Sequence, residues 1–296
     1  MDRDRCHRCH VNDQGAAEVA AWANAEVAPW FAEASRGQYT QEFEPDPLGR
    51  IERQNVDECF IDPRALTGDP FTNVMTYIRD LSGSSGRATP GVLSYGPPSA
   101  TGRSGRVQVD SVQQWIHEIG HTLNWPHSYV EPTWPYSNPV DIMSGGFNAE
   151  HTLAINRLAV GWVDDDQVAL HPSGNAYYAL DRPAGDGLQL VMLPDPSQPL
   201  RSMTLEARPA TGRDATIKEP GVAIHVVDQQ SGGGTFRRQG QALGDDFSTF
   251  SYERVIAVGK SVRLHGVTVR VVAAAGDGYL VQVIGTYRAA GSLPTF

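Results

Sequence analysis

Two histidines and a glutamate in the middle of the chain have the spacing of a catalytic metal site. His117, Glu118 and His121 form the pattern H-E-x-x-H. Residues four apart on a helix lie on one face, one turn above the other, so both imidazoles can reach a single point. Zinc takes such nitrogen ligands in tetrahedral geometry, and a catalytic zinc keeps one position open for water. We therefore expect His117 and His121 to bind Zn²⁺.

The third ligand is expected from His127, beyond the end of that helix. Pro126 prevents the helix from continuing, so the chain has to turn back after Leu123. The residue at this turn is Asn124, and asparagine is among the few non-glycine residues that tolerate positive φ. With three imidazoles on the metal, Glu118 is not needed as a ligand. It can instead take a proton from the zinc-bound water and hand it to the leaving amine.

The residues around these histidines predict the helix that must carry them. Asp110 or Ser111 can cap its first turn with a side-chain oxygen. Apolar residues recur at helical spacing and predict one buried face, formed by Val112, Trp115, Ile116, Ile119 and Leu123. An ordinary buried helix would show the same stripe. The cap, the helix stop and the third histidine together favour a metal site.

Together these residues resemble the metzincin signature of zinc peptidases, H-E-x-x-H-x-x-G-x-x-H followed downstream by a methionine-containing turn. Asn124 stands where that signature has glycine. The resemblance implies that Met143, within Val140–Gly145, forms the turn and lies as an apolar base beneath the ligands. Ordinary core filling is the alternative role for this methionine. Residues 136–162 are further similar to the gametolysin-type branch and its mucin-cleaving bacterial relatives, some of which carry a β-rich domain after the protease.

The periodicity of the rest of the chain predicts the fold class α+β. Residues 1–14 form a polar tail, and the resemblance to metzincins implies that residues 15–165 are a metzincin-like catalytic domain with a mixed sheet and helices. Residues 170–290 are expected to form an antiparallel β-sandwich, because short β-rich runs alternate there with turn residues. Further helices are predicted at 16–34, about 70–81 and 149–158, a strand at 39–43, and β-rich runs at 177–180, 188–193, 222–227, 262–272 and 279–284.

Composition limits the partners. The net charge of −10 argues against nucleic acid, because phosphate binding needs clustered Lys and Arg. No apolar run approaches the length of a membrane span, and no signal-peptide core is seen at the N-terminus. We expect a monomer, extracellular or secreted, that acts on a polypeptide or glycoprotein. The glycoprotein part of this expectation comes from the resemblance alone.

Other residues leave alternatives open. Cys6 to His10 contain C-x-x-C-H, a haem-attachment pattern, but the same residues can form a disulfide with Cys59, bind the zinc as a thiolate, or have no role. The run Asp164-Asp165-Asp166 can bind Ca²⁺ or be a solvated linker. Tyr129 or Tyr136 can donate a hydrogen bond to an oxyanion. The remaining histidines lack ligand spacing and are expected to be ordinary surface or strand residues, namely His151, His171, His225 and His265.

The sequence therefore predicts a zinc-dependent endopeptidase in which a zinc-bound water is activated by Glu118. The alternative is an inactive relative whose sandwich binds a glycan or a protein surface. The intact Glu118 favours the enzyme, since a purely structural zinc site would not need that carboxylate.

Overall fold

The computed structural model describes residues 16–45, 74–77, 87–89, 104–107, 112–123, 125–129, 138–144, 150–229 and 248–288. The chain divides into two compact units. The described residues of the first unit lie within 16–32 and 40–125, and those of the second lie within 33–39 and 126–288. The first unit is built of helices and one small sheet, and the second of two larger sheets and a short helix. That residues 15–165 and residues 170–290 each fold independently as a domain stays a prediction.

Two helices open the first unit where one was predicted. They are α1 (Ala16–Glu26) and α2 (Ala28–Ala34), and the break at Val27 lies just before Pro29. Proline lacks an amide hydrogen and its ring collides with the preceding turn of a helix, which accounts for the break.

The strand predicted at 39–43 is wrong, because this segment forms no ladder with another strand in the described part of the chain. Side chains bond to its backbone at both ends instead, Ser35 at Tyr39 and Asn24 at Phe43. The amide of Phe43 donates to Asn24 Oδ1 at 2.8 Å, and Asn24 Nδ2 donates to the carbonyl oxygen of Phe43 at 2.8 Å. A single side-chain amide thus supplies the donor and the acceptor that a neighbouring strand would have offered.

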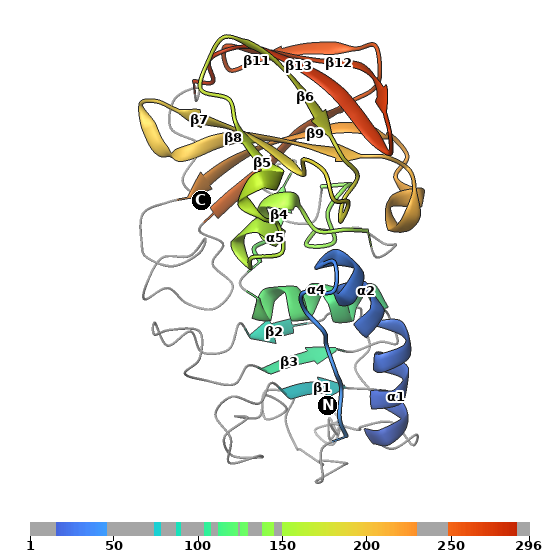
Figure 1. Cartoon of the computed structure of the whole chain (residues 1–296). Helices are drawn as coiled ribbons and strands as arrows, with labels where there is room; N and C mark the ends of the chain where they lie inside the picture. Colours follow the sequence, from blue (N-terminus) through green and yellow to red (C-terminus); the bar gives the residue numbers. More distant parts are fainter. Residues whose placement is uncertain are drawn as a thin grey trace, which may run out of the picture. The chain divides into compact units, whose positions relative to one another are not determined.

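The first unit contains a mixed sheet with the strand order β1-β3-β2. Strand β1 (Val74–Tyr77) runs parallel to β3 (Ser104–Val107), and β2 (Arg87–Thr89) runs antiparallel to it. The helix predicted at 70–81 is therefore wrong over β1, whose β-branched and aromatic residues favour a strand. Helix α4 (Val112–Thr122) packs against β2 and β3 (Figure 1).

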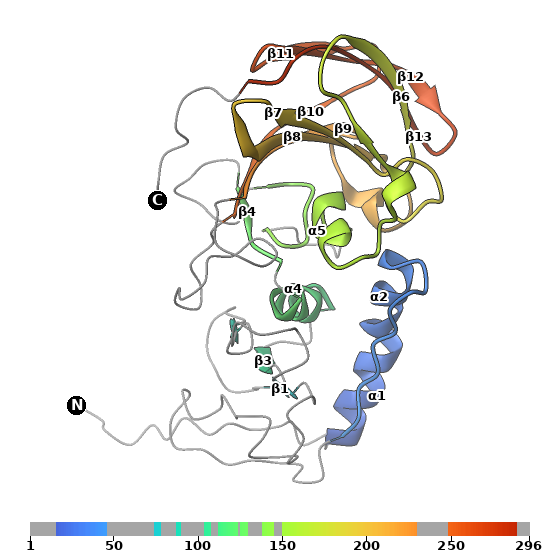
Figure 2. The ribbon, with the colours of Figure 1, turned by 60° about the vertical axis from the view of Figure 1, so that its left-hand side comes forward.

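The second unit is a sandwich of a six-stranded and a four-stranded sheet (Figure 2). The six-stranded order is β4-β10-β9-β8-β7-β5 and the four-stranded order is β11-β12-β13-β6. The strands are β4 (Ser128–Tyr129), β5 (Val168–Leu170), β6 (Asn175–Leu180), β7 (Leu190–Asp195), β8 (Gln198–Arg208), β9 (Gly221–Gln229), β10 (Ser248–Ile256), β11 (Ser261–Leu264), β12 (Val267–Ala275) and β13 (Gly278–Gly285).

All five predicted β-rich runs overlap strands of this sandwich, and one of them, 262–272, spans β11, a turn and β12. Strands β4, β5, β8 and β10 were not predicted. The four-stranded sheet is antiparallel, as expected. The six-stranded sheet is mixed, because β4 runs parallel to β10 at one edge and β5 runs parallel to β7 at the other. The prediction of an antiparallel sandwich concerned residues 170–290, and the strands from β6 to β13 do pair antiparallel with one another. The two parallel edge strands come from segments that precede this range, so it is the complete sheet that is mixed.

The facing sides of the two sheets form one apolar core, which includes Val191, Leu205 and Ile224 from the larger sheet and Val269 and Val281 from the smaller. The other side of the six-stranded sheet is covered as well. Residues at the start of helix α5 (Ala154–Ala159), in the region predicted to be helical at 149–158, pack against Leu190 and Val227. Both faces of this sheet are therefore buried. Among the described residues no helix is long and apolar enough to cross a membrane.

Candidate metal centre

Aromatic side chains hold helix α4 in place. Trp115 makes edge-to-face contacts with Trp22 of α1 and with Phe43, each with ring centroids 5.5 Å apart. Trp125, just past the helix end, packs in the same manner against Trp30 of α2 at 6.1 Å. Such pairs stabilise beyond their burial, so the helix is anchored near both of its ends.

The helix ends close to the predicted position. The Leu123 amide donates to the carbonyl oxygens of Ile119 and Gly120, and the Trp125 amide donates to Gly120 at 3.0 Å. The last carbonyl groups of the helix thereby receive partners before the chain leaves it. Asn124 lies outside the described residues, so its positive φ stays a prediction.

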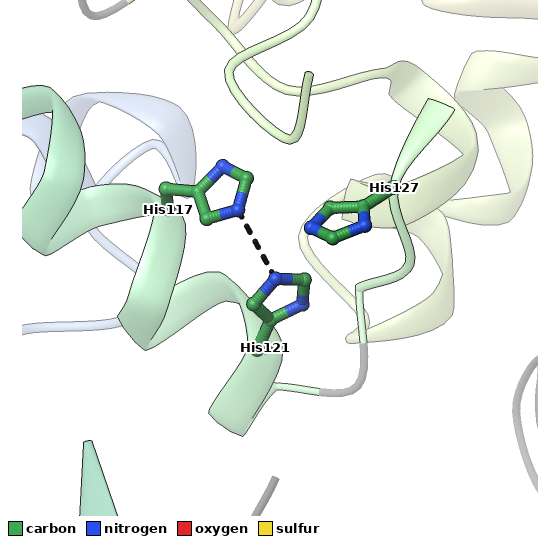
Figure 3. A group of neighbouring side chains, drawn as sticks. All are labelled: His117, His121 and His127. Carbon is green, nitrogen blue, oxygen red and sulfur yellow. Dashed lines mark hydrogen bonds between the residues drawn. The ribbon is translucent and has the colours of Figure 1, made fainter. Parts of the chain in front are cut away.

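The structure brings together His117, His121 and His127. One ligand atom from each residue lies within 4.8 Å of the other two. Figure 3 shows two of the rings projecting from α4 and the third from the segment that leads into β4. Within the described parts of the chain, no other group of three His, Cys, Asp or Glu side chains is arranged in this way.

The two ring nitrogens on the helix already have the separation that a shared metal requires. His117 Nε2 and His121 Nε2 are 3.1 Å apart, and the rings are perpendicular. Two imidazole nitrogens on one tetrahedral zinc, each at the usual bond length, are roughly 3.3 Å apart. The donor set, made of three imidazoles and no hard oxygen ligand, also suits zinc better than calcium or magnesium.

A backbone contact defines which nitrogen of His121 can bind a metal. Its Nδ1 lies 2.9 Å from the carbonyl oxygen of Trp125, which can only accept a hydrogen bond. Nδ1 therefore carries the proton, and the lone pair is left on Nε2, which faces the other imidazoles. Metal-binding histidines commonly have their second nitrogen oriented in this way.

Glu118 belongs to the buried stretch of α4 between Trp115 and His121 and is 4 % exposed. Met143 is fully buried, and its amide donates to Asp141 Oδ1 at 3.2 Å. Its role as a base beneath the ligands stays a prediction. Cys6, Cys9, Cys59 and Tyr136 lie outside the described residues, as does the side chain of Tyr129.

Two further predictions concern residues away from this centre. His225 lies in strand β9 and His171 directly follows β5, and both are buried and hydrogen-bonded. Asp164, Asp165 and Asp166 form no ligand group in the described structure; Asp164 pairs with Arg36, and the next two begin a short 3₁₀ turn.

Sequence reasoning missed a group of polar residues that follow the third histidine. Ser128, Asn138 and Asp141 are buried and hydrogen-bonded to one another, and Asn138 also contacts His225 of β9. One signal was available, because His225 interrupts the apolar run 222–227 and a buried histidine needs a polar partner. The identity of that partner was not readable from the strand.

No known protein family, curated protein or solved structure matches this chain.

Proposed function

We propose that this protein is a zinc-dependent endopeptidase of the metzincin type. The observation that carries the proposal is the convergence of His117, His121 and His127, with ligand atoms within 4.8 Å of one another. Three neutral imidazoles suit a catalytic zinc, which keeps a fourth position for water or substrate. Bound zinc supplies Lewis-acid chemistry, since it polarises a carbonyl group and lowers the pKa of a water molecule.

Glu118 is the residue that we assign to proton transfer. It follows the first ligand directly in α4, and its burial keeps bulk water away from the carboxylate. In this role the carboxylate accepts a proton from the attacking water and returns it to the leaving amine. The contact of His121 Nδ1 with the carbonyl oxygen of Trp125 favours the tautomer in which Nε2 is available as a ligand.

The remaining features support the proposal less directly. Helix α4 lies against a mixed sheet, and Met143 is buried downstream of the ligands, as the resemblance to metzincins implies. A polypeptide or glycoprotein substrate, an extracellular location and a monomeric state belong to the same proposal.

The test is zinc content together with digestion of casein and of a mixed peptide library, with and without a chelator. The purified chain should contain one zinc per molecule and cleave peptides, and the chelator should abolish cleavage. Glu118→Ala should keep the zinc and lose at least about 10²-fold in rate. Glu118→Gln is the matched variant, because it preserves shape and polarity but cannot accept the proton.

Two results contradict the proposal. A Glu118→Gln variant within tenfold of the parent rate would remove the carboxylate from the mechanism. A chain that binds zinc tightly but cleaves nothing would point to the alternative, an inactive relative that acts as a binding module.

A further inference from the structure

The residue next to the third histidine is held by a buried hydrogen-bond network. Ser128 is fully buried; its hydroxyl donates to Asp141 Oδ2 at 2.6 Å and accepts from Asn138 Nδ2 at 2.9 Å. Its backbone is paired too, because β4 runs beside β10 with Ser128 opposite Phe250. Both the side chain and the backbone of the residue after His127 are thus fixed by the second unit.

The network continues into the centre of the six-stranded sheet. Asn138 Nδ2 donates its second hydrogen to His225 Nε2 at 2.9 Å. The other polar atoms of Asn138 are also hydrogen-bonded. Its backbone N–H donates to Ser144 Oγ at 2.7 Å, and its side-chain Oδ1 accepts from the backbone N–H of Val140 at 3.1 Å. Asn138 therefore has one orientation, and it connects strand β9 to Ser128.

The three ligands differ in what holds them. His117 and His121 project from one helix, whose geometry sets their spacing. His127 lies on an irregular segment between Trp125 and β4, so its direction depends on what fixes the neighbouring residues. We propose that Ser128, Asn138 and His225 are positioning residues for the metal centre, through which the sandwich sets the direction of the third ligand. The proposal rests on the proposed function only in taking His127 as a metal ligand.

The chain offers a matched pair of hydroxyl groups to test this. Thr152 Oγ1 donates to the other oxygen of Asp141 at 3.2 Å and accepts from Asn156 Nδ2 at 2.8 Å. Ser128 and Thr152 are thus both fully buried, both donate to Asp141, and both accept from an asparagine amide. They differ in that only Ser128 is adjacent to His127 in the sequence.

The experiment compares Ser128→Ala with Thr152→Val in the full chain. Zinc affinity is measured by competition with a chromophoric chelator, the geometry of the site by the visible spectrum of bound Co²⁺, and stability by the thermal midpoint of the metal-free protein. Loss of a residue that orients a ligand typically weakens metal binding by about 10–100-fold. We expect such a loss and an altered Co²⁺ spectrum for Ser128→Ala. Thr152→Val should lower the thermal midpoint similarly but keep the affinity within about twofold of the parent.

A second pair tests the part of the network in β9. His225→Leu should weaken zinc binding, and His225→Gln should retain most of the affinity, because the glutamine oxygen can accept from Asn138 as Nε2 does. His171→Leu is the control, since His171 is equally buried but bonds to the Tyr178 hydroxyl and the Gly285 carbonyl oxygen. If Ser128→Ala matches Thr152→Val in affinity, or His225→Leu matches His171→Leu, the network is merely structural and the proposal is overturned.

These readouts need no substrate, so the two proposals can fail separately. A parent protein that binds zinc without cleaving peptides would end the peptidase assignment and leave the positioning role standing. Equal affinities within the matched pairs would end the positioning role and leave the peptidase assignment standing. A parent that binds no zinc overturns both.

Discussion

The two faces of the six-stranded sheet bury different kinds of side chain. In β8, Met203, Leu205 and Ala207 enter the apolar core between the sheets. The alternate residues face the other way and are polar or charged, yet they are equally buried: Ser202, Thr204, Glu206 and Arg208. One strand therefore contributes to two interiors with opposite chemistry.

The polar face is held by directed contacts with the segments that cover it. Arg208 pairs with Asp214 at 3.0 Å and with Glu206 at 3.4 Å. Glu206 also accepts from the amide of Ala154 at 2.6 Å, at the start of α5. Apolar contacts tolerate many arrangements, whereas a buried charge requires particular partners. We infer that the apolar face stabilises the sandwich, while the polar face selects how residues 138–144 and 150–163 lie on it.

Removing the charge of Arg208 from the polar face should cause the largest loss in the free energy of unfolding. Arg208→Leu leaves two buried carboxylates without their cation, which typically costs about 3–5 kcal/mol. Urea denaturation at pH 7 measures this free energy of unfolding. The control is Arg270→Leu on the exposed side of β12, expected to change stability by less than about 0.5 kcal/mol. If Arg208→Leu lowers the free energy of unfolding no more than Arg270→Leu does, the buried ion pairs contribute little to stability.

Conservative substitutions sharpen the contrast between the faces. Leu205→Met keeps volume and polarity, so it should cost less than about 1.5 kcal/mol. Arg208→Lys keeps the charge but loses the fork that reaches both carboxylates, and it should cost about 2–3 kcal/mol. The measurement is again urea denaturation. Equal costs would mean that the polar face is no more directional than the apolar one.

The pH dependence of stability should be traceable to His225 on the polar face. Burial, with the nearby charge of Arg208, lowers the pKa of His225 to about 3. Below the ordinary histidine value the unfolded chain takes up a proton that the folded chain refuses, so stability falls as the pH drops from about 6.5 towards 3. Between pH 7 and pH 5 this amounts to about 2 kcal/mol.

His225→Gln removes that contribution. The difference in unfolding free energy between parent and variant should therefore shift by about 2 kcal/mol in the variant's favour on going from pH 7 to pH 5. Other groups titrate in this range, but they are common to both proteins and cancel in the difference. A difference that does not change with pH would mean that the pKa of His225 is the same in the folded and the unfolded chain.

The smallest change in stability is expected at an exposed ion pair outside the buried polar face. Arg36 pairs with Asp164, whose side chain is more than half exposed. Exposed ion pairs contribute about 0–1 kcal/mol, so Asp164→Ala should be close to neutral in thermal denaturation. A loss comparable to that of Arg208→Leu would erase the distinction between the buried network and its solvated edge.

The sequence by itself determined features that depend on spacing within one element. The i, i+4 histidines of α4, the helix stop before Pro126 and five of the β-rich runs after residue 175 could be predicted. The physical reason is that the period of a helix or strand decides which residues share a face. Even β8, which was missed, alternates apolar and polar residues in the pattern of a strand buried on one face.

Tertiary structure alone decided the features that join distant segments. Residues 74–77 became a strand because a parallel partner at 104–107 was available. Residues 39–43 did not, and the side chains of Ser35 and Asn24 bond to the two ends of that segment instead. The link from Ser128 through Asn138 to His225 likewise spans most of the second unit in sequence. Local patterns indicate that a residue is buried and polar. Which partner satisfies it depends on how the chain folds back, and no periodicity within one element carries that information.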